Sequence, residues 1–226
     1  MTLPNVPPHT ELFNIAVGTR DACRLFLGTN AESAISPLAI AAFQLQAAHV
    51  GARIAAMATE AAYGEMLRAI VTDSEGGFSV SLNLSARCSA TVVDLCAAAL
   101  GRLLGRSGLP SREMDAAEIA NSLKKAPAPA PLAPLVDPFV VRLGSTDWDS
   151  IVTLRHAVTH KVYKRGVYGS TRQAPEPAPL AWPQQNDVEW GGRMVAMDAA
   201  AGAMVSFADD TFREFCGNLA RLAPAS

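Results

Sequence analysis

The sequence contains few cysteines, and they are scattered. The four are Cys23, Cys88, Cys96 and Cys216 in a chain of 226 residues, and no two are spaced as a CxxC pair. A structural zinc site of the CxxC type therefore has no support in the sequence. We expect all four thiols to be reduced and buried among apolar side chains, as in a cytoplasmic protein.

The chain also has few aromatic residues and little net charge. Aromatic residues make up 6% of the sequence, and the net charge is −2. A chain this close to neutral is not a general polyanion binder, so any contact with nucleic acid must come from a local basic patch. Because alanine is abundant and β-branched residues do not dominate, the composition favours helices over strands.

Several signatures of function and targeting are missing. The sequence has no GxxxxGK[ST], no strand-borne GxGxxG, no GxSxG and no HExxH. Its N-terminal segment has no basic stretch followed by an apolar run, so no targeting signal is expected. The most apolar long run, 37–58, is interrupted by polar residues and predicts a core helix without membrane contact.

Apolar residues recur at helical spacing through most of the chain. The pattern predicts an all-α fold, a bundle of five or six helices forming a single domain over residues 1–226. Ser36 before Pro37 is a typical helix start, and Ser111 and one of Ser145, Thr146 or Asp147 are the caps of later helices. The predicted helices run from about 10 to 28, from 36 to 70 or 71, and over 91–104, 111–125, 147–165 and 193–222.

Four segments do not fit a helical pattern. Residues 1–9 are proline-rich and are expected to form an irregular arm, and two proline-rich connections cover 126–138 and 174–183. Alternating proline at 126–138 favours polyproline II, as a linker or a strap over the surface. Residues 78–85 alternate apolar and polar side chains, which fits either a strand or an extended connector.

The segment Leu154–Lys161 contains two of the four histidines of the chain. On a helix over 147–165, Arg155 falls within an otherwise apolar stripe, where a charge is costly unless it is paired or used. His156 and His160 lie one turn apart on the flank of that stripe. A fixed cation beside a group that titrates near neutrality is a candidate catalytic pair. The stripe consists of Trp148, Ile151, Val152, Val158 and Val162.

Arg155-His156-Ala157-Val158-Thr159-His160 resembles the R-x4-H motif of HEPN domains, with a polar residue directly after the arginine. The resemblance implies a helical bundle that dimerises, and a metal-independent endoribonuclease of a toxin or defence system. It further implies that Arg155 binds the scissile phosphate, that His160 is the general acid or base, and that His156 orients the pair. An RNA substrate and an antitoxin or other regulatory protein would be the partners, besides a second copy. Neighbouring phosphates and bases would contact Lys161, Lys164, Arg165, Tyr163 and Tyr168.

A purely structural role for the motif is the alternative. An arginine on an apolar helix face often pairs with a core carboxylate, and Glu60, Glu65 and Asp94 are the candidates here. Basic residues near a helix C-terminus also complement the helix dipole without any ligand. In this interpretation the protein is a catalytically inactive helical protein–protein interaction module.

A metal site is a further alternative. His156 and His160 are spaced so that both imidazoles can reach one metal ion, and His49 could supply a third nitrogen. This arrangement is similar to that of DinB-like bundles. However, Lys164 stands where that family would have another ligand. The HEPN resemblance, in contrast, implies no metal and no cofactor.

Overall fold

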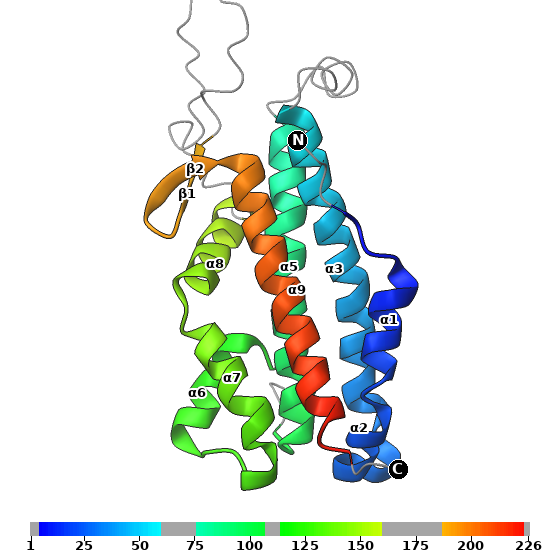
Figure 1. The fold of residues 1–226 in the computed structure, drawn as a ribbon. Helices are drawn as coiled ribbons and strands as arrows, with labels where there is room; N and C mark the ends of the chain where they lie inside the picture. The colour runs from blue at the N-terminus through cyan, green and yellow to red at the C-terminus, as the bar shows by residue number, and fades with distance from the viewer. Residues whose placement is uncertain (1–4, 60–75, 107–113, 160–186, 224–226) are drawn as a thin grey trace, which may run out of the picture.

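The structure, a computed structural model, describes residues 5–59, 76–106, 114–159 and 187–223. Figure 1 shows a bundle of helices with one small β-hairpin, so the predicted all-α helical bundle is confirmed. The elements are, in chain order, α1 (His9–Val17), α2 (Arg20–Leu27), a 3₁₀ turn (Gly28–Asn30), α3 (Glu32–Thr59), α5 (Gly76–Leu103), α6 (Ala116–Lys125), a 3₁₀ turn (Ala130–Leu132), α7 (Ala133–Leu143), α8 (Thr146–Thr159), β1 (Asp187–Trp190), β2 (Arg193–Ala196) and α9 (Met197–Ala220).

Three long helices, α3, α5 and α9, form the centre of the bundle. The short helices α1 and α2 pack along α3 on one side, whereas α6, α7 and α8 lie on the other side, against α5 and α9 (Figure 1). Buried apolar residues from all these helices form one contiguous core. Helices α6 and α8 both contact α5, on the side of the bundle that carries the Arg155 motif.

The contact between α3 and α5 is unusually close because both helices present small side chains. Gly51 of α3 faces Ser81 and Ser85 of α5, and a methyl group at Gly51 would lie 2.7 Å from the Ser85 Oγ atom. Ser81, Ser85 and Ser89 are buried and recur every four residues, along one face of α5. Small residues at this spacing let two backbones approach each other, which explains the alanine-rich composition of both helices.

Residues 78–85 belong to α5, so the prediction of a strand or extended connector is wrong. The alternation of serine with apolar residues has a helical cause. Ser81 and Ser85 lie against Gly51 of α3, and Ser89, Leu82 and Ala86 are also buried. A helix face made of serine produces a local polar–apolar alternation that resembles the two-residue period of a strand.

Helix α5 is also the most membrane-like segment among the described residues. Ser81–Leu103 is long and apolar enough to cross a membrane, because an 18-residue window of it has a mean hydropathy of 1.3, but 72% of that window is buried inside the bundle. This burial is typical of a core helix. Residues 37–58, predicted to form a core helix, lie in α3, which packs against α5.

Two predicted N-terminal helix boundaries are corrected. The helix expected from about 10 to 28 is divided at Gly18 and Thr19, where the Thr19 hydroxyl donates to the Ala16 carbonyl over 2.7 Å. Helix α3 begins at Glu32, before the predicted Ser36 cap, and Pro37 lies inside it. Pro37 has no N–H, so one hydrogen bond is lost near the start of α3. The free energy of that loss is smaller than the stabilisation gained when one face of α3 is buried.

The first proline-rich connection is partly helical. Residues 133–138 form the first half of α7, so the expected linker or strap is confined to the preceding residues. Pro134 lies in the first turn, where backbone N–H groups have no acceptor within the helix, so a proline there removes no helical hydrogen bond. Pro138 lies further inside, and burial of Leu135, Val136 and Phe139 outweighs its missing hydrogen bond.

The start of the predicted last helix is a β-hairpin. Asp187–Trp190 pairs antiparallel with Arg193–Ala196, and α9 begins only at Met197. Gly191 and Gly192 form the turn with φ angles of 58° and 75°. A two-residue turn with both angles positive matches the twist of a hairpin and favours glycine at both positions.

The two remaining helix starts follow capping rules. Asp115, not the predicted Ser111, is the N-cap of α6, and it forms a capping box with Glu118. Ser145, one of the three predicted caps, accepts a hydrogen bond from the Trp148 N–H at the start of α8. Ser111, the end of the predicted 147–165 helix and the second proline-rich connection at 174–183 lie outside the described residues.

Candidate functional site

Arg155 of α8 is paired with an internal acid. Its Nη1 atom lies 2.6 Å from the Oδ2 atom of Asp94 on α5. The Arg155 side chain is 41% exposed and the Asp94 side chain 23%. The ion pair accounts for the charge on the apolar face, since Trp148, Ile151 and Leu154 of α8 are buried around it.

Asp94 has a second bond that extends this junction to α6. Its Oδ1 atom accepts a hydrogen bond of 3.1 Å from the Ala116 N–H, at the first residue of α6. Burial raises the pKa of the Asp94 carboxyl, and the Ala116 and Arg155 contacts only partly oppose that rise. Asp94 therefore joins α5, α6 and α8, and its full pairing stabilises the charge of a largely buried carboxylate.

Arg155 and His156 are the only predicted catalytic residues that the structure describes. His156 is exposed and follows Arg155 on the outer side of α8. His160 lies outside the described residues. The predicted RNA contacts, Lys161, Tyr163, Lys164 and Arg165, and the candidate acids Glu60 and Glu65 lie outside them too.

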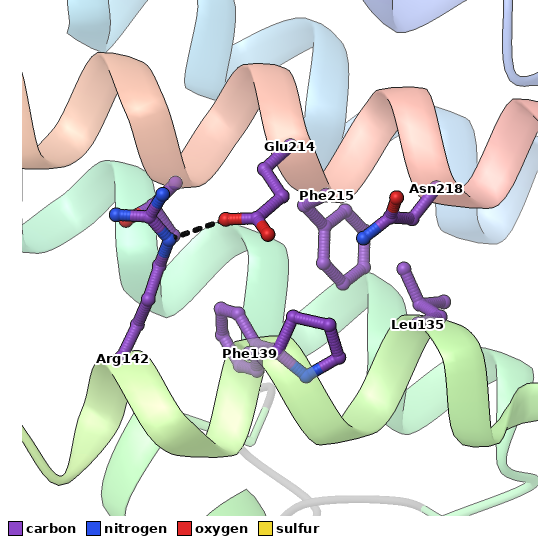
Figure 2. Close-up of a pocket in the computed structure, with 8 residues that line it drawn as sticks. Leu135, Phe139, Arg142, Glu214, Phe215 and Asn218 are labelled. Carbon is purple, nitrogen blue, oxygen red and sulfur yellow. Dashed lines mark hydrogen bonds and ion pairs between the residues drawn. The ribbon is translucent and has the colours of Figure 1, made fainter.

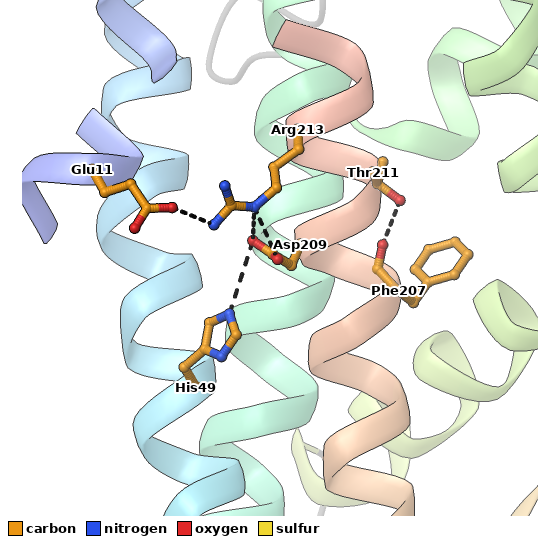
Figure 3. Close-up of polar contacts among 6 residues, drawn as sticks. All are labelled: Glu11, His49, Phe207, Asp209, Thr211 and Arg213. Carbon is orange, nitrogen blue, oxygen red and sulfur yellow. Dashed lines mark hydrogen bonds and ion pairs between the residues drawn. The ribbon is translucent and has the colours of Figure 1, made fainter. Parts of the chain in front are cut away.

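His49 belongs to a separate charged cluster between α1, α3 and α9 (Figure 3). Its Nε2 atom lies 3.9 Å from the Asp209 Oδ1 atom, an ion-pair distance when the imidazole is protonated. Arg213 binds Asp209 at 2.9 Å and Glu11 of α1 at 2.9 Å. Burial alone would raise the pKa of Asp209, but His49 and Arg213 outweigh it and lower the pKa.

This cluster bears on the metal alternative. His49 points to Asp209 of α9 (Figure 3), so its imidazole is used between two core helices. Within residues 5–59, 76–106, 114–159 and 187–223, no three His, Cys, Asp or Glu side chains are grouped to hold a metal ion. The described residues therefore give the metal interpretation no third ligand.

The four cysteines are free and buried, as the sequence predicted. Burial raises the pKa of Cys23, Cys88, Cys96 and Cys216, so each thiol stays protonated near neutral pH. A protonated, inaccessible thiol is a poor nucleophile. They act as small core residues.

A small cavity lies between α7 and α9 (Figure 2). Its volume is about 10 Å³, which is room for about one water molecule. Arg142 and Glu214 form an ion pair of 2.6 Å at its edge, and Phe139 and Phe215 pack edge to face beside it. The space is far smaller than a site for a small-molecule substrate.

The outer face of α3 carries an apolar stripe that sequence reasoning missed. Ile40, Phe43 and Val50 are 47%, 55% and 38% exposed, and Ala47 and Ile54 are partly buried between and beyond them. We call these five residues the α3 stripe. Their alternating spacing of three and four residues was the available signal, but the apolar run was used only to predict a core helix over 37–58.

Comparisons with known proteins leave the family open. No protein-family model matches the chain, and no curated protein and no solved structure matches it. The fold and the geometry of its own residues are therefore the basis for any functional proposal.

Proposed function

We propose that this chain is a helical protein-interaction module that binds through the α3 stripe. The observation that carries the proposal is the exposure of Ile40, Phe43 and Val50 in one row on a central helix. Isolated exposed apolar residues are normal on a protein surface, but a contiguous row of them marks a binding face. The stripe keeps this exposure although α1 packs along α3 and its His9 ring lies on Phe43, so the described part of the bundle covers the stripe only in part.

The contacts of Arg155 support this non-catalytic proposal. Arg155 is bound by Asp94 at 2.6 Å, and the same carboxylate accepts a hydrogen bond from the Ala116 N–H at the start of α6. To bind a scissile phosphate, Arg155 would have to share its contact with Asp94 or break it. Asp94 joins three helices, α5, α6 and α8. The pair therefore fits a structural role for Arg155.

RNA cleavage is the second candidate function, and one observation favours it. The Arg155 side chain is 41% exposed next to the exposed His156, so a phosphate could approach the guanidinium without unfolding of α8. In this proposal Arg155 holds the phosphate and His160 transfers the proton. The HEPN resemblance and the metal-independent chemistry belong to this candidate alone.

Cleavage of a mixed RNA pool in EDTA distinguishes the two functions. The native chain is compared with Arg155→Ala and His160→Ala, each checked for folding by circular dichroism. The interaction module predicts no cleavage by any of the three. Cleavage by the native chain alone, with 2′,3′-cyclic phosphate ends, would replace the interaction module by the ribonuclease.

Site-specific photo-crosslinking tests the interaction module directly. A photoreactive amino acid is placed at Phe43 in the full chain and, as a matched control, at Val141, which is 74% exposed on α7. We expect a discrete crosslinked product from position 43 in cells, its loss when Val50→Glu is added, and none from position 141. Absence of a discrete product at 43 would overturn the proposal.

A further inference from the structure

We infer that the α3 stripe binds the same stripe of a second copy of this chain, with the two α3 helices antiparallel. The inference rests on the proposed function, because it names the partner of the same surface. Residues spaced alternately by three and four form the seam of a two-stranded helical packing, in which side chains of one helix fill gaps in the other. A stripe with this spacing is therefore complementary to itself.

The position of the bulky residues suggests where the two helices cross. Ile40 and Phe43 are the most exposed apolar side chains of the stripe. If the helices are antiparallel and the two-fold axis passes between these residues, Ile40 of each copy meets Phe43 of the other. The His9 ring lies on the Phe43 ring, with centroids 3.8 Å apart, which holds the phenyl group in one orientation before binding.

Charge complementarity favours this antiparallel register. Glu32 precedes the proposed crossing point by about as many residues as Arg53 follows it, and both belong to the same flank of the stripe. The two-fold axis therefore brings Glu32 of each copy to Arg53 of the other. In a parallel pair the two Glu32 side chains would lie at one end and the two Arg53 side chains at the other.

Both charged residues have the exposure that this pairing requires. Arg53 is exposed and makes no ion pair with any residue in the described part of the chain. Glu32 is 71% exposed, and its contact with Arg20 is long, at 4.0 Å. Surface contacts of this kind contribute little, so Glu32 can exchange partners at low cost.

The size of the surface indicates a reversible dimer. Apolar patches of roughly 300–600 Å² are typical of functional monomer surfaces, whereas a stable interface buries about 800 Å² on each partner. The α3 stripe has three exposed apolar side chains, whereas an interface of that size contains about 20–30 residues on each partner. We therefore expect the dimer to dissociate on dilution.

Sedimentation velocity over a range of concentrations tests the inference on the full chain. We expect a concentration-dependent dimer for the native protein, its loss in Phe43→Glu, and native behaviour in the control Val141→Glu. Phe43 is 55% exposed, so its replacement leaves the core unchanged. Circular dichroism verifies that both variants are folded.

Charge reversal tests the antiparallel register separately. Glu32→Arg and Arg53→Glu each place like charges together, so each alone should weaken the dimer by about threefold to tenfold, as surface pairs do. An equimolar mixture of the two variants should restore dimers, as should the double variant, because opposite charges then face each other again.

The outcomes separate this inference from the proposed function. A native chain that stays monomeric at all concentrations, with a crosslink from position 43 to a different protein, would overturn self-association and leave the interaction module intact. A native dimer that does not respond to Phe43→Glu would overturn the role of the stripe. A dimer that Phe43→Glu abolishes but that single charge reversals leave unchanged would overturn the antiparallel register.

Discussion

At Gly51 the backbones of α3 and α5 approach so closely that there is no space for a methyl group. A Cβ atom there would lie 2.7 Å from the Ser85 Oγ atom and 3.0 Å from the Ser81 carbonyl oxygen and the Ser85 nitrogen. Two of these three atoms belong to the backbone of α5 and cannot rotate away. Gly51 is therefore fixed by packing, and its φ angle is not the cause.

The substitution Gly51→Ala should destabilise the protein. Forcing a methyl group into this contact costs about 1–3 kcal/mol, more than the gain in helix propensity of about 1 kcal/mol. The matched control is Gly202→Ala in α9, where a Cβ atom has no neighbour within 4 Å. Urea unfolding should show a lower free energy for Gly51→Ala and an equal or higher one for Gly202→Ala. Equal effects at both sites would contradict the close contact.

The Arg155–Asp94 pair connects secondary-structure elements, because it holds α8 and α6 on α5. We expect Arg155→Met to lower the free energy of unfolding by about 1–2 kcal/mol, below the value for a fully buried pair because Arg155 is 41% exposed. Asp94→Asn should cost a similar amount, and the double variant less than the sum.

A double-mutant cycle measured by urea unfolding provides the check. A coupling of about 1 kcal/mol between positions 94 and 155 is expected for this charged hydrogen bond. Strictly additive effects would show that the pair contributes nothing. Neither variant touches the α3 stripe, so their dimerisation should match that of the native chain.

The two prolines of α7 provide a test of the helical state of this segment. Pro138 removes a hydrogen bond inside the helix, whereas Pro134 is in the first turn. Pro138→Ala should therefore stabilise the protein by about 1 kcal/mol, after the greater entropy of the unfolded chain is subtracted. Pro134→Ala should be neutral or slightly destabilising. Thermal unfolding compares the two, and stabilisation by Pro134→Ala alone would contradict the helical assignment.

These same elements show which parts of the structure the sequence could predict. Ser145 and the apolar side of α9 followed from capping and periodicity, which are local properties. The helical state of 78–85 did not, because its serines are explained only by Gly51 on another helix. The helix through Pro138 was missed for a similar reason, since burial against α9 overrides a local penalty. The Gly191-Gly192 hairpin had a local signal in its two glycines that the prediction of one long helix obscured.

At the scale of the whole molecule, the Arg155–Asp94 pair and the α3 stripe both result from the way the helices pack. Asp94 was one of three acids that the sequence offered to Arg155, and only the packing of α5 against α8 selects it among the described residues. The α3 stripe follows from the same topology, because α5 and α9 pack on one side of α3 and α1 covers only part of the rest. Both features depend on which helices pack together, and local sequence patterns do not predict that.

Two carboxyls of the described residues, Asp209 and Asp94, have pKa values shifted in opposite directions, so they change the stability at acid pH in opposite ways. The pKa of Asp209 is lowered in the folded chain below its ordinary value of 3.8. The stability that it contributes is fully present above that value and is lost as the pH falls through the folded pKa. The pKa of Asp94 is raised, so protonation of Asp94 favours the folded state and adds stability before the ordinary value is reached.

Asp209→Asn should therefore change the shape of the stability profile as well as its height. At neutral pH we expect a loss of about 1 kcal/mol, because Arg213 keeps only Glu11 as its partner. Below pH 3.8 the profile of this variant should be flatter than that of the native chain, since the lowered pKa no longer contributes. Arg213→Gln should flatten the profile in the same way, because it removes a main cause of the lowered pKa. Urea unfolding between pH 2 and 7 measures both variants. A native acid slope in Asp209→Asn would show that other carboxyls account for the loss of stability and that the cluster between α1, α3 and α9 has little part in it.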